Sequence, residues 1–204
     1  MIAGYVDAYG FIAYRTYVSF MSGNTTQTGF LLGQGNLAAA APALVAIPFF
    51  FAGVFIGTFL AHSSARQSRW VPFGGVATLL ASVIGVTQLS SLGSGVGIAM
   101  LSLAMGLMNT ALSRVGNQSV NLVFVTGTLN AIAQHLALAF KGSPTHNRQA
   151  LFLIGVWTSF LTGAFVAGLA TPRFGVWVLL FPVVILLALA VFSRPQDSTQ
   201  CVLR

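Results

Sequence analysis

Eight long apolar stretches, nearly free of charge, limit what this chain can fold into. Only 5% of the 204 residues are charged, whereas soluble domains carry about 25%. A bilayer-spanning helix needs about 20 residues, and only helices and closed barrels satisfy their backbone polar groups in lipid. The sequence therefore predicts an all-α, multi-pass integral membrane protein, with the lipid bilayer as a partner. The stretches run at roughly 1–14, 17–33, 43–62, 71–89, 96–112, 120–140, 150–170 and 174–192.

The formal net charge of +7 does not indicate nucleic-acid binding. Nine Lys and Arg residues are scattered singly between apolar runs and form no stripe. We interpret them as markers of membrane topology. The start of the chain lacks the basic region and cleavage site of a signal peptide. Cys201, the single cysteine, lies in the polar tail, so we expect no internal disulfide and no cysteine metal cluster.

Two halves of the chain resemble each other. Gly4–Ala8 and Phe20–Gly29 in the first half match Gly106–Thr110 and Phe124–Asn130 in the second. Asn24 and Asn130 are taken as the matching amides. We expect residues 1–192 to form one transmembrane domain made of repeats 1–92 and 93–192, and residues 193–204 to form a polar cytoplasmic tail.

The third and seventh stretches repeat a second pattern. Gly53–Gly57 and Gly163–Ala167 both place small residues four positions apart with a phenylalanine between them. Small residues at this spacing allow helices to approach closely in lipid. Three features in the same order favour a duplication over a chance likeness of apolar sequences.

The number of crossings decides the symmetry of the repeats. If all eight stretches cross, the repeats are parallel and the basic residues divide almost evenly between the two sides. If 17–33 and 120–140 instead dip into the membrane and return, six stretches cross and the repeats are inverted. The basic residues then divide seven to two, which agrees with the positive-inside rule, so we favour the inverted arrangement. The seven are Arg66, Arg69, Arg114, Lys141, Arg148, Arg194 and Arg204; the two are Arg15 and Arg173.

The run Gly4–Phe11 followed by Phe20–Thr26 resembles the signature of the YoaK-like bacterial membrane proteins, a family classed as a domain of unknown function (1275). The likeness covers nearly the whole chain, including Gly127–Leu129. It implies an inner-membrane protein of about six helices and supplies no substrate or reaction. Members usually carry more residues before the first motif, so the first helix is expected to be shortened.

Polar residues beside glycine in both repeats form the candidate substrate site, which is expected at the interface of the two repeats. Gly23 and Gly127 are expected to break their helices and to expose backbone groups at mid-membrane, as in many secondary transporters. The alternative is a hydrogen-bond network that only packs the repeats together. The predicted substrate-binding residues are Asp7, Gly23, Asn24, Thr25, Gln27, Asn109, Thr126, Gly127, Thr128 and Asn130.

Two titratable residues are candidates for proton coupling. Asp7 is one of only two acidic residues, and an ionisable group in an apolar segment is a functional hypothesis by default. Its alternative role is structural, and its counterpart Asn109 cannot titrate. His135 is a candidate proton relay or a simple hydrogen-bonding residue. His62 and His146 are interpreted as interfacial, and the three histidines share no metal-binding spacing, so no metal site is expected.

The sequence contains no catalytic motif and predicts no enzyme and no cofactor. We expect a secondary transporter or facilitator of a small polar solute that is neutral or singly charged, proton-coupled through Asp7. A channel is an alternative. The other alternative is a membrane scaffold that does not transport, in which the polar motifs only hold the halves together. A homodimer is left open.

Overall fold

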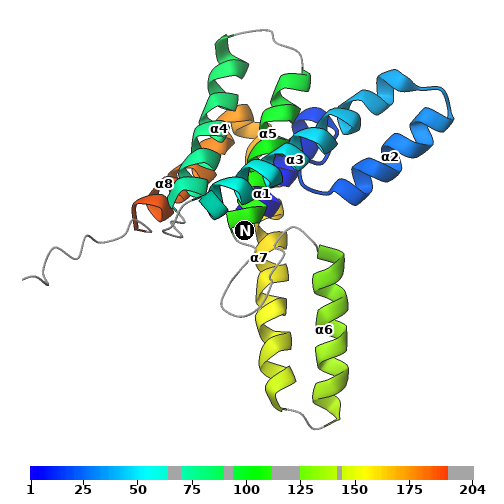
Figure 1. Ribbon diagram of the computed structural model, residues 1–204, viewed down its shortest axis with the longest axis vertical. Helices are drawn as coiled ribbons and strands as arrows, with labels where there is room; N and C mark the ends of the chain where they lie inside the picture. Colours follow the sequence, from blue (N-terminus) through cyan, green and yellow to red (C-terminus); the bar gives the residue numbers. More distant parts are fainter. Residues whose placement is uncertain (64–69, 90–93, 112–124, 142–143, 193–204) are drawn as a thin grey trace, which may run out of the picture.

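The computed structural model describes the chain apart from residues 64–69, 90–93, 112–124, 142–143 and 193–204 (Figure 1). The predicted polar tail and five of the nine basic residues, Arg66, Arg69, Arg114, Arg194 and Arg204, lie outside the described residues. The described part is helical, which agrees with the predicted all-α class. The elements are α1 (Ile2–Tyr14), α2 (Met21–Gly33), α3 (Leu37–Ser63), α4 (Trp70–Leu89), α5 (Ser94–Ala111), α6 (Val125–Phe140), α7 (Pro144–Phe174), the 3₁₀ helix η1 (Gly175–Leu179) and α8 (Leu180–Phe192).

Two stretches of the described chain are long and apolar enough to cross a bilayer, namely Leu37–Leu60 in α3 and His146–Phe192, which includes α7, η1 and α8. Shorter apolar helices lie at Pro72–Gln88 and Ser94–Thr110. By length and composition, these helices are consistent with a helical membrane protein. The count of six crossings stays a prediction.

Within the described parts of the two polar stretches, α2 and α6 are short continuous helices, which corrects the prediction that glycine breaks them. Gly23 lies inside α2 and Gly127 inside α6, in the first turn of each helix. At 1.5 Å per residue, the 13 residues of α2 span about 20 Å and the 16 residues of α6 about 24 Å. Both are shorter than the hydrocarbon core of about 30 Å. A single glycine costs about 1 kcal/mol in a helix, too little to interrupt one.

Each short polar helix folds back along the long helix that follows it. α2 packs against α3, and α6 packs against α7. The two hairpins extend from the body of the molecule as separate arms (Figure 1). The body contains two further close pairs, α3 with α5 and α1 with α7, and α4 packs against both α5 and α8.

Glycines bring the backbones of α3 and α5 into contact. A Cβ atom on Gly53 would collide with the carbonyl oxygen of Leu103, and one on Gly106 would collide with that of Phe50. Each carbonyl belongs to the residue three positions before the opposing glycine. Since lipid supplies no hydrophobic force between helices, such close backbone packing is what holds them together.

The crossing of α1 and α7 has the same construction. A Cβ atom on Gly4 would collide with the carbonyl oxygen of Phe160, and one on Gly163 would collide with that of Met1. Again each carbonyl lies three residues before the opposing glycine. The two crossings therefore use the same residue offsets at positions that the sequence matched between its halves.

The outward faces of α3 and α7 are apolar. Phe51, Phe55 and Phe59 form a stripe along α3, with exposed fractions of 71%, 64% and 65%. On α7 the stripe consists of Leu161, Phe165 and Leu169, again four residues apart and all exposed. Exposed apolar surface of this kind suits hydrocarbon rather than water. The buried core lies on the inner side, between α1, α4, α5, η1 and α8.

We expect Gly106→Ala to destabilise the protein by about 1–3 kcal/mol, because the added methyl group meets backbone that cannot move aside. Gly85→Ala is the control, since a Cβ there meets nothing within 4 Å and alanine favours the helix. The thermal unfolding midpoint of the detergent-purified protein measures both changes. Equal midpoints for the two variants would contradict the close approach of α3 and α5.

Candidate functional site

Asp7 binds the link between α1 and α2, residues 15–20, to the buried side of α1. Its Oδ1 atom accepts hydrogen bonds from the backbone N–H groups of Val18 at 2.9 Å and Ser19 at 2.8 Å. The Asp7 side chain is only 6% exposed. A buried carboxylate needs such donors, because an unpaired charge away from water is very costly. The residue that the sequence singled out for its charge therefore also has a structural role.

The backbone conformation at the end of α1 explains why the link turns back and packs against α1. α1 ends at Arg15, which adopts a left-handed conformation with φ of 56°, and whose N–H donates to the carbonyl of Phe11. Gly10 leaves room for the returning chain, since a Cβ there would lie 2.7 Å from Cγ1 of Val18. The side chains of Phe11 and Tyr17 stack with their ring centres 4.7 Å apart.

Asn24 is the most deeply buried polar residue of the predicted site. Its side chain is 0% exposed, and Nδ2 donates to the carbonyl oxygen of Tyr17 at 2.7 Å. The same nitrogen lies 3.8 Å from the sulfur of Met21. Its Oδ1 atom is buried and has no hydrogen-bond partner among the described residues. An unpartnered buried amide oxygen costs about 1–3 kcal/mol, so this atom is suited to a ligand that donates a hydrogen bond.

The inner face of α2 is polar, which reverses the usual pattern of a surface helix. Asn24, Gln27 and Thr28 lie on that face, three and four residues apart, and are buried or half-buried. Thr25 and Thr26 lie on the exposed side. Thr25 is part of the predicted site, but its hydroxyl donates to the carbonyl of Met21 at 2.7 Å.

Three buried hydroxyl groups in the described residues share the unpartnered state of the Asn24 oxygen, and two of them lie beside it; the third, Oγ of Ser102, lies on α5. The Oγ1 atoms of Thr16 and Thr28 are buried and make no hydrogen bond within the described part of the chain. Thr28 is one turn from Asn24 on the same helix face, and Thr16 precedes the residues that Asp7 binds. We call Asp7, Thr16, Asn24, Gln27 and Thr28 the α1–α2 polar site. Thr16 was missed because the sequence gives no sign that the link between the helices turns inward.

The second-half residues of the predicted site lie elsewhere. Thr126 and Asn130 are exposed on α6, Gly127 and Thr128 are half-buried there, and Asn109 is half-buried on α5. Since α2 and α6 belong to separate arms, the structure does not bring Asn24 and Asn130 together (Figure 1).

The burial pattern of α2 and α6 favours a different match between the two motifs. If Gly23 is matched with Gly127, then Asn24 corresponds to Thr128, and Asn130 corresponds to the exposed Thr26. Thr128 does lie on the inner side of α6, near the buried Ile132 one turn later. On this match, Thr128 is the counterpart of Asn24 on the packed face of the helix, whereas Asn130 shares only its residue type. The sequence does not show directly which face of a helix packs.

His135 and His146 contact each other across the α6–α7 hairpin. Their Nδ1 atoms are 3.0 Å apart, and the rings stack with centres 5.2 Å apart. In the sequence the two residues are separate candidates, one in a polar stretch and one near a loop boundary. Because the ten residues between them include the turn from α6 to α7, no spacing rule for a single helix could pair them.

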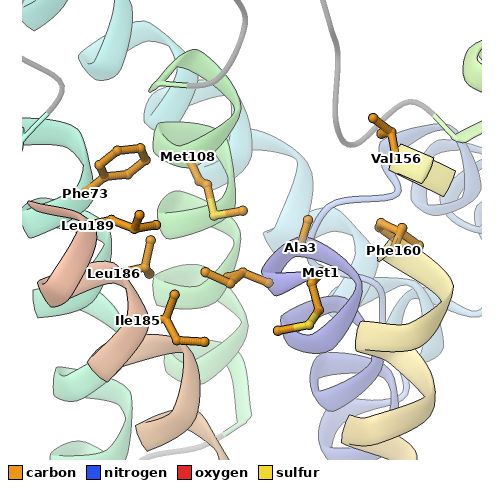
Figure 2. Close-up of a pocket in the computed structure, with 10 residues that line it drawn as sticks. Met1, Ala3, Phe73, Met108, Val156, Phe160, Ile185, Leu186 and Leu189 are labelled. Carbon is orange, nitrogen blue, oxygen red and sulfur yellow. The ribbon is translucent and has the colours of Figure 1, made fainter. Parts of the chain in front are cut away.

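A cavity of about 270 Å³ shares no residue with the α1–α2 polar site and is lined by apolar side chains (Figure 2). A polar solute would find no hydrogen-bond partner among these side chains. The residues that line the cavity come from the start of the chain and from α1, α4, α5, α7 and α8. They are Met1, Ile2, Ala3, Phe73, Met108, Val156, Phe160, Ile185, Leu186 and Leu189.

We expect Asp7→Ala to lower the free energy of unfolding by about 3 kcal/mol, because two buried backbone N–H groups lose a charged acceptor. Asp7→Asn retains an oxygen acceptor and is expected to lose less. As a control, Asn36→Ala removes an exposed cap, the 3.1 Å bond to the Ala39 N–H, for about 1 kcal/mol. Thermal unfolding ranks the three variants, and an Asp7→Ala loss no larger than that of Asn36→Ala would contradict this role of Asp7.

Comparison with known proteins agrees with the resemblance seen in the motifs. The chain is 27% identical over 197 residues to the UPF0700 transmembrane protein RA0705 of Rhizobium meliloti (strain 1021), covering 96% of this chain and 84% of that protein. It is 24% identical over 208 residues to the UPF0700 transmembrane protein YoaK of Bacillus subtilis (strain 168), covering 97% and 92%. No solved structure matches the chain. Residues 1–192 match the family described as "Protein of unknown function (DUF1275)", and the chain belongs to that family.

Proposed function

We propose that this protein is a secondary transporter or facilitator of a small polar solute, bound at the α1–α2 polar site. The observation that carries the proposal is the buried, unpartnered Oδ1 atom of Asn24, together with the unpartnered hydroxyls of Thr16 and Thr28. Three such groups beside one link are more than packing alone requires, since each lowers stability unless something binds it.

The chemistry of these atoms selects the solute. The Asn24 oxygen accepts hydrogen bonds, and the two threonine hydroxyls both donate and accept. A small solute with N–H or O–H groups meets this need. A multiply charged solute does not, because the site contains no basic residue to bind an anion, and its one acidic residue, Asp7, already accepts two backbone donors at Oδ1. The solute class is therefore neutral or singly charged.

A proton-coupled mechanism would use Asp7. Protonation of its carboxyl would weaken the hold on the N–H groups of Val18 and Ser19, and that change would reach Tyr17 and the amide of Asn24 bound to it. The coupling is local, because the link between the helices joins both residues. His135 lies in the other arm, so any proton relay through it would be independent of Asp7.

The architecture that suits this function is a pair of inverted repeats in the bacterial inner membrane. Its support is the repeated offset at the α1–α7 and α3–α5 crossings, where each pair joins a first helix of one half to a third helix of the other. The names of the two relatives, both transmembrane proteins, support the membrane location. Inverted repeats are common in secondary transporters. Their sites usually lie at the repeat interface, whereas the α1–α2 polar site lies within the first repeat.

A scaffold that does not transport is the second candidate. The observation that favours it is the use of the Asp7 carboxylate and the Asn24 amide nitrogen to hold backbone groups. On this hypothesis the motif packs the link and binds no solute.

A solute panel separates the two candidates. We expect one class of small polar solute to raise the thermal unfolding midpoint of the purified protein, because a ligand that binds the folded state stabilises it by mass action. Asn24→Ala should abolish the rise, and Thr26→Ala, on the exposed side of α2, should retain it. Each variant is compared with its own ligand-free midpoint, so a loss of stability is not mistaken for a loss of binding.

Flux measurements complete the test. Protein in vesicles should take up the stabilising solute, and Asp7→Asn should change the dependence of uptake on a pH gradient. Accelerated exchange between internal and external solute indicates a carrier rather than a channel. If folded protein responds to no solute in a broad panel, the scaffold hypothesis replaces the transporter.

A further inference from the structure

We propose that His135 and His146 form a binding site for one divalent transition-metal ion of the Zn²⁺, Ni²⁺ or Cu²⁺ class. The two imidazoles come from antiparallel helices and present their Nδ1 atoms to each other at 3.0 Å. Both side chains are half-buried between α6 and α7. The site is separate from the α1–α2 polar site and does not depend on the proposed transport function.

The separation of the nitrogens fits a shared metal ion. Zinc–imidazole bonds are about 2.0–2.1 Å long, so two of them place their nitrogens 3.0 Å apart when they meet at about 95°. That angle lies between the octahedral and tetrahedral values. The two ring planes lie 28° from parallel, so the imidazoles must turn about their Cβ–Cγ bonds before both Nδ1 lone pairs point to one ion.

The ligand set leaves coordination positions open. No group of three or more His, Cys, Asp or Glu side chains lies together in the described residues. The ion would therefore be held by two protein nitrogens, and water or an exchangeable ligand would complete its coordination. Imidazole suits Zn²⁺, Cu²⁺ and Ni²⁺, whereas Mg²⁺ and Ca²⁺ prefer oxygen ligands.

The surrounding charges set the conditions for binding. Lys141 at the end of α6 and Arg148 near the start of α7 are the described cationic groups closest in sequence, and both are exposed. Their repulsion of a metal ion is weakened by water and salt. A protonated imidazole cannot bind a metal, so binding must weaken as the pH falls. The bound ion would link α6 to α7 near the end of their arm.

Calorimetric titration of the full chain, with any affinity tag removed and metal stripped, tests the site. We expect Zn²⁺ or Ni²⁺ to bind at one ion per chain at pH 7.5 and to raise the unfolding midpoint by several degrees. His135→Gln and His146→Gln should each reduce the affinity at least tenfold. His62→Gln, which removes the third histidine, should leave the binding unchanged.

Spectroscopy with Cu²⁺ checks the ligands independently of stability. We expect the electron paramagnetic resonance spectrum to show coupling to two imidazole nitrogens in the wild type and to fewer in either single variant. Binding that is equal in wild type and His135→Gln would overturn the proposal. So would the absence of binding to folded wild type, which would leave the pair as a simple hydrogen bond between imidazoles.

Discussion

The rest of this structure depends on the direct contact of helix backbones at two crossings. In lipid, no hydrophobic force draws helices together, so they associate where small residues let the main chains meet. Gly53 and Gly106 provide this at α3–α5, and Gly4 and Gly163 provide it at α1–α7. Both crossings join the two halves of the chain. The long helices then leave the body with their outer faces free, and each carries a stripe of exposed apolar side chains.

The α1–α2 polar site follows from the position that the α1–α7 crossing gives to α1. Three residues after Gly4, the Asp7 carboxylate binds the returning link through Val18 and Ser19. The link in turn holds the amide of Asn24 through Tyr17. A continuous series of contacts therefore runs from the α1–α7 crossing, through the hydrogen bonds of Asp7, to the buried amide of Asn24. A change at Asp7 should affect both stability and whatever Asn24 binds, and the matched variants separate these effects.

Sequence reasoning identified Asp7 and Asn24, because a carboxyl group and an amide in apolar stretches need partners. It missed Thr16, whose burial depends on where the link lies. It also matched Asn24 with Asn130, because residue type was easier to see than helical face. The helix breaks expected at Gly23 and Gly127 are absent although the neighbouring serine, asparagine and threonine residues are weak helix formers. Packing along α3 and α7 supports both helices.

The sequence by itself determined the helical class, the membrane character and the family, because composition and short motifs are properties of the chain. It also marked Gly53 and Gly163 for close helix contact, whereas Gly4 and Gly106 appeared only as parts of the repeated motif. Only the tertiary structure decided which helices meet, that the two polar motifs lie in separate arms, and that His135 faces His146. These facts depend on contacts between distant residues. Local spacing cannot determine such contacts, because they arise when helices pack against one another.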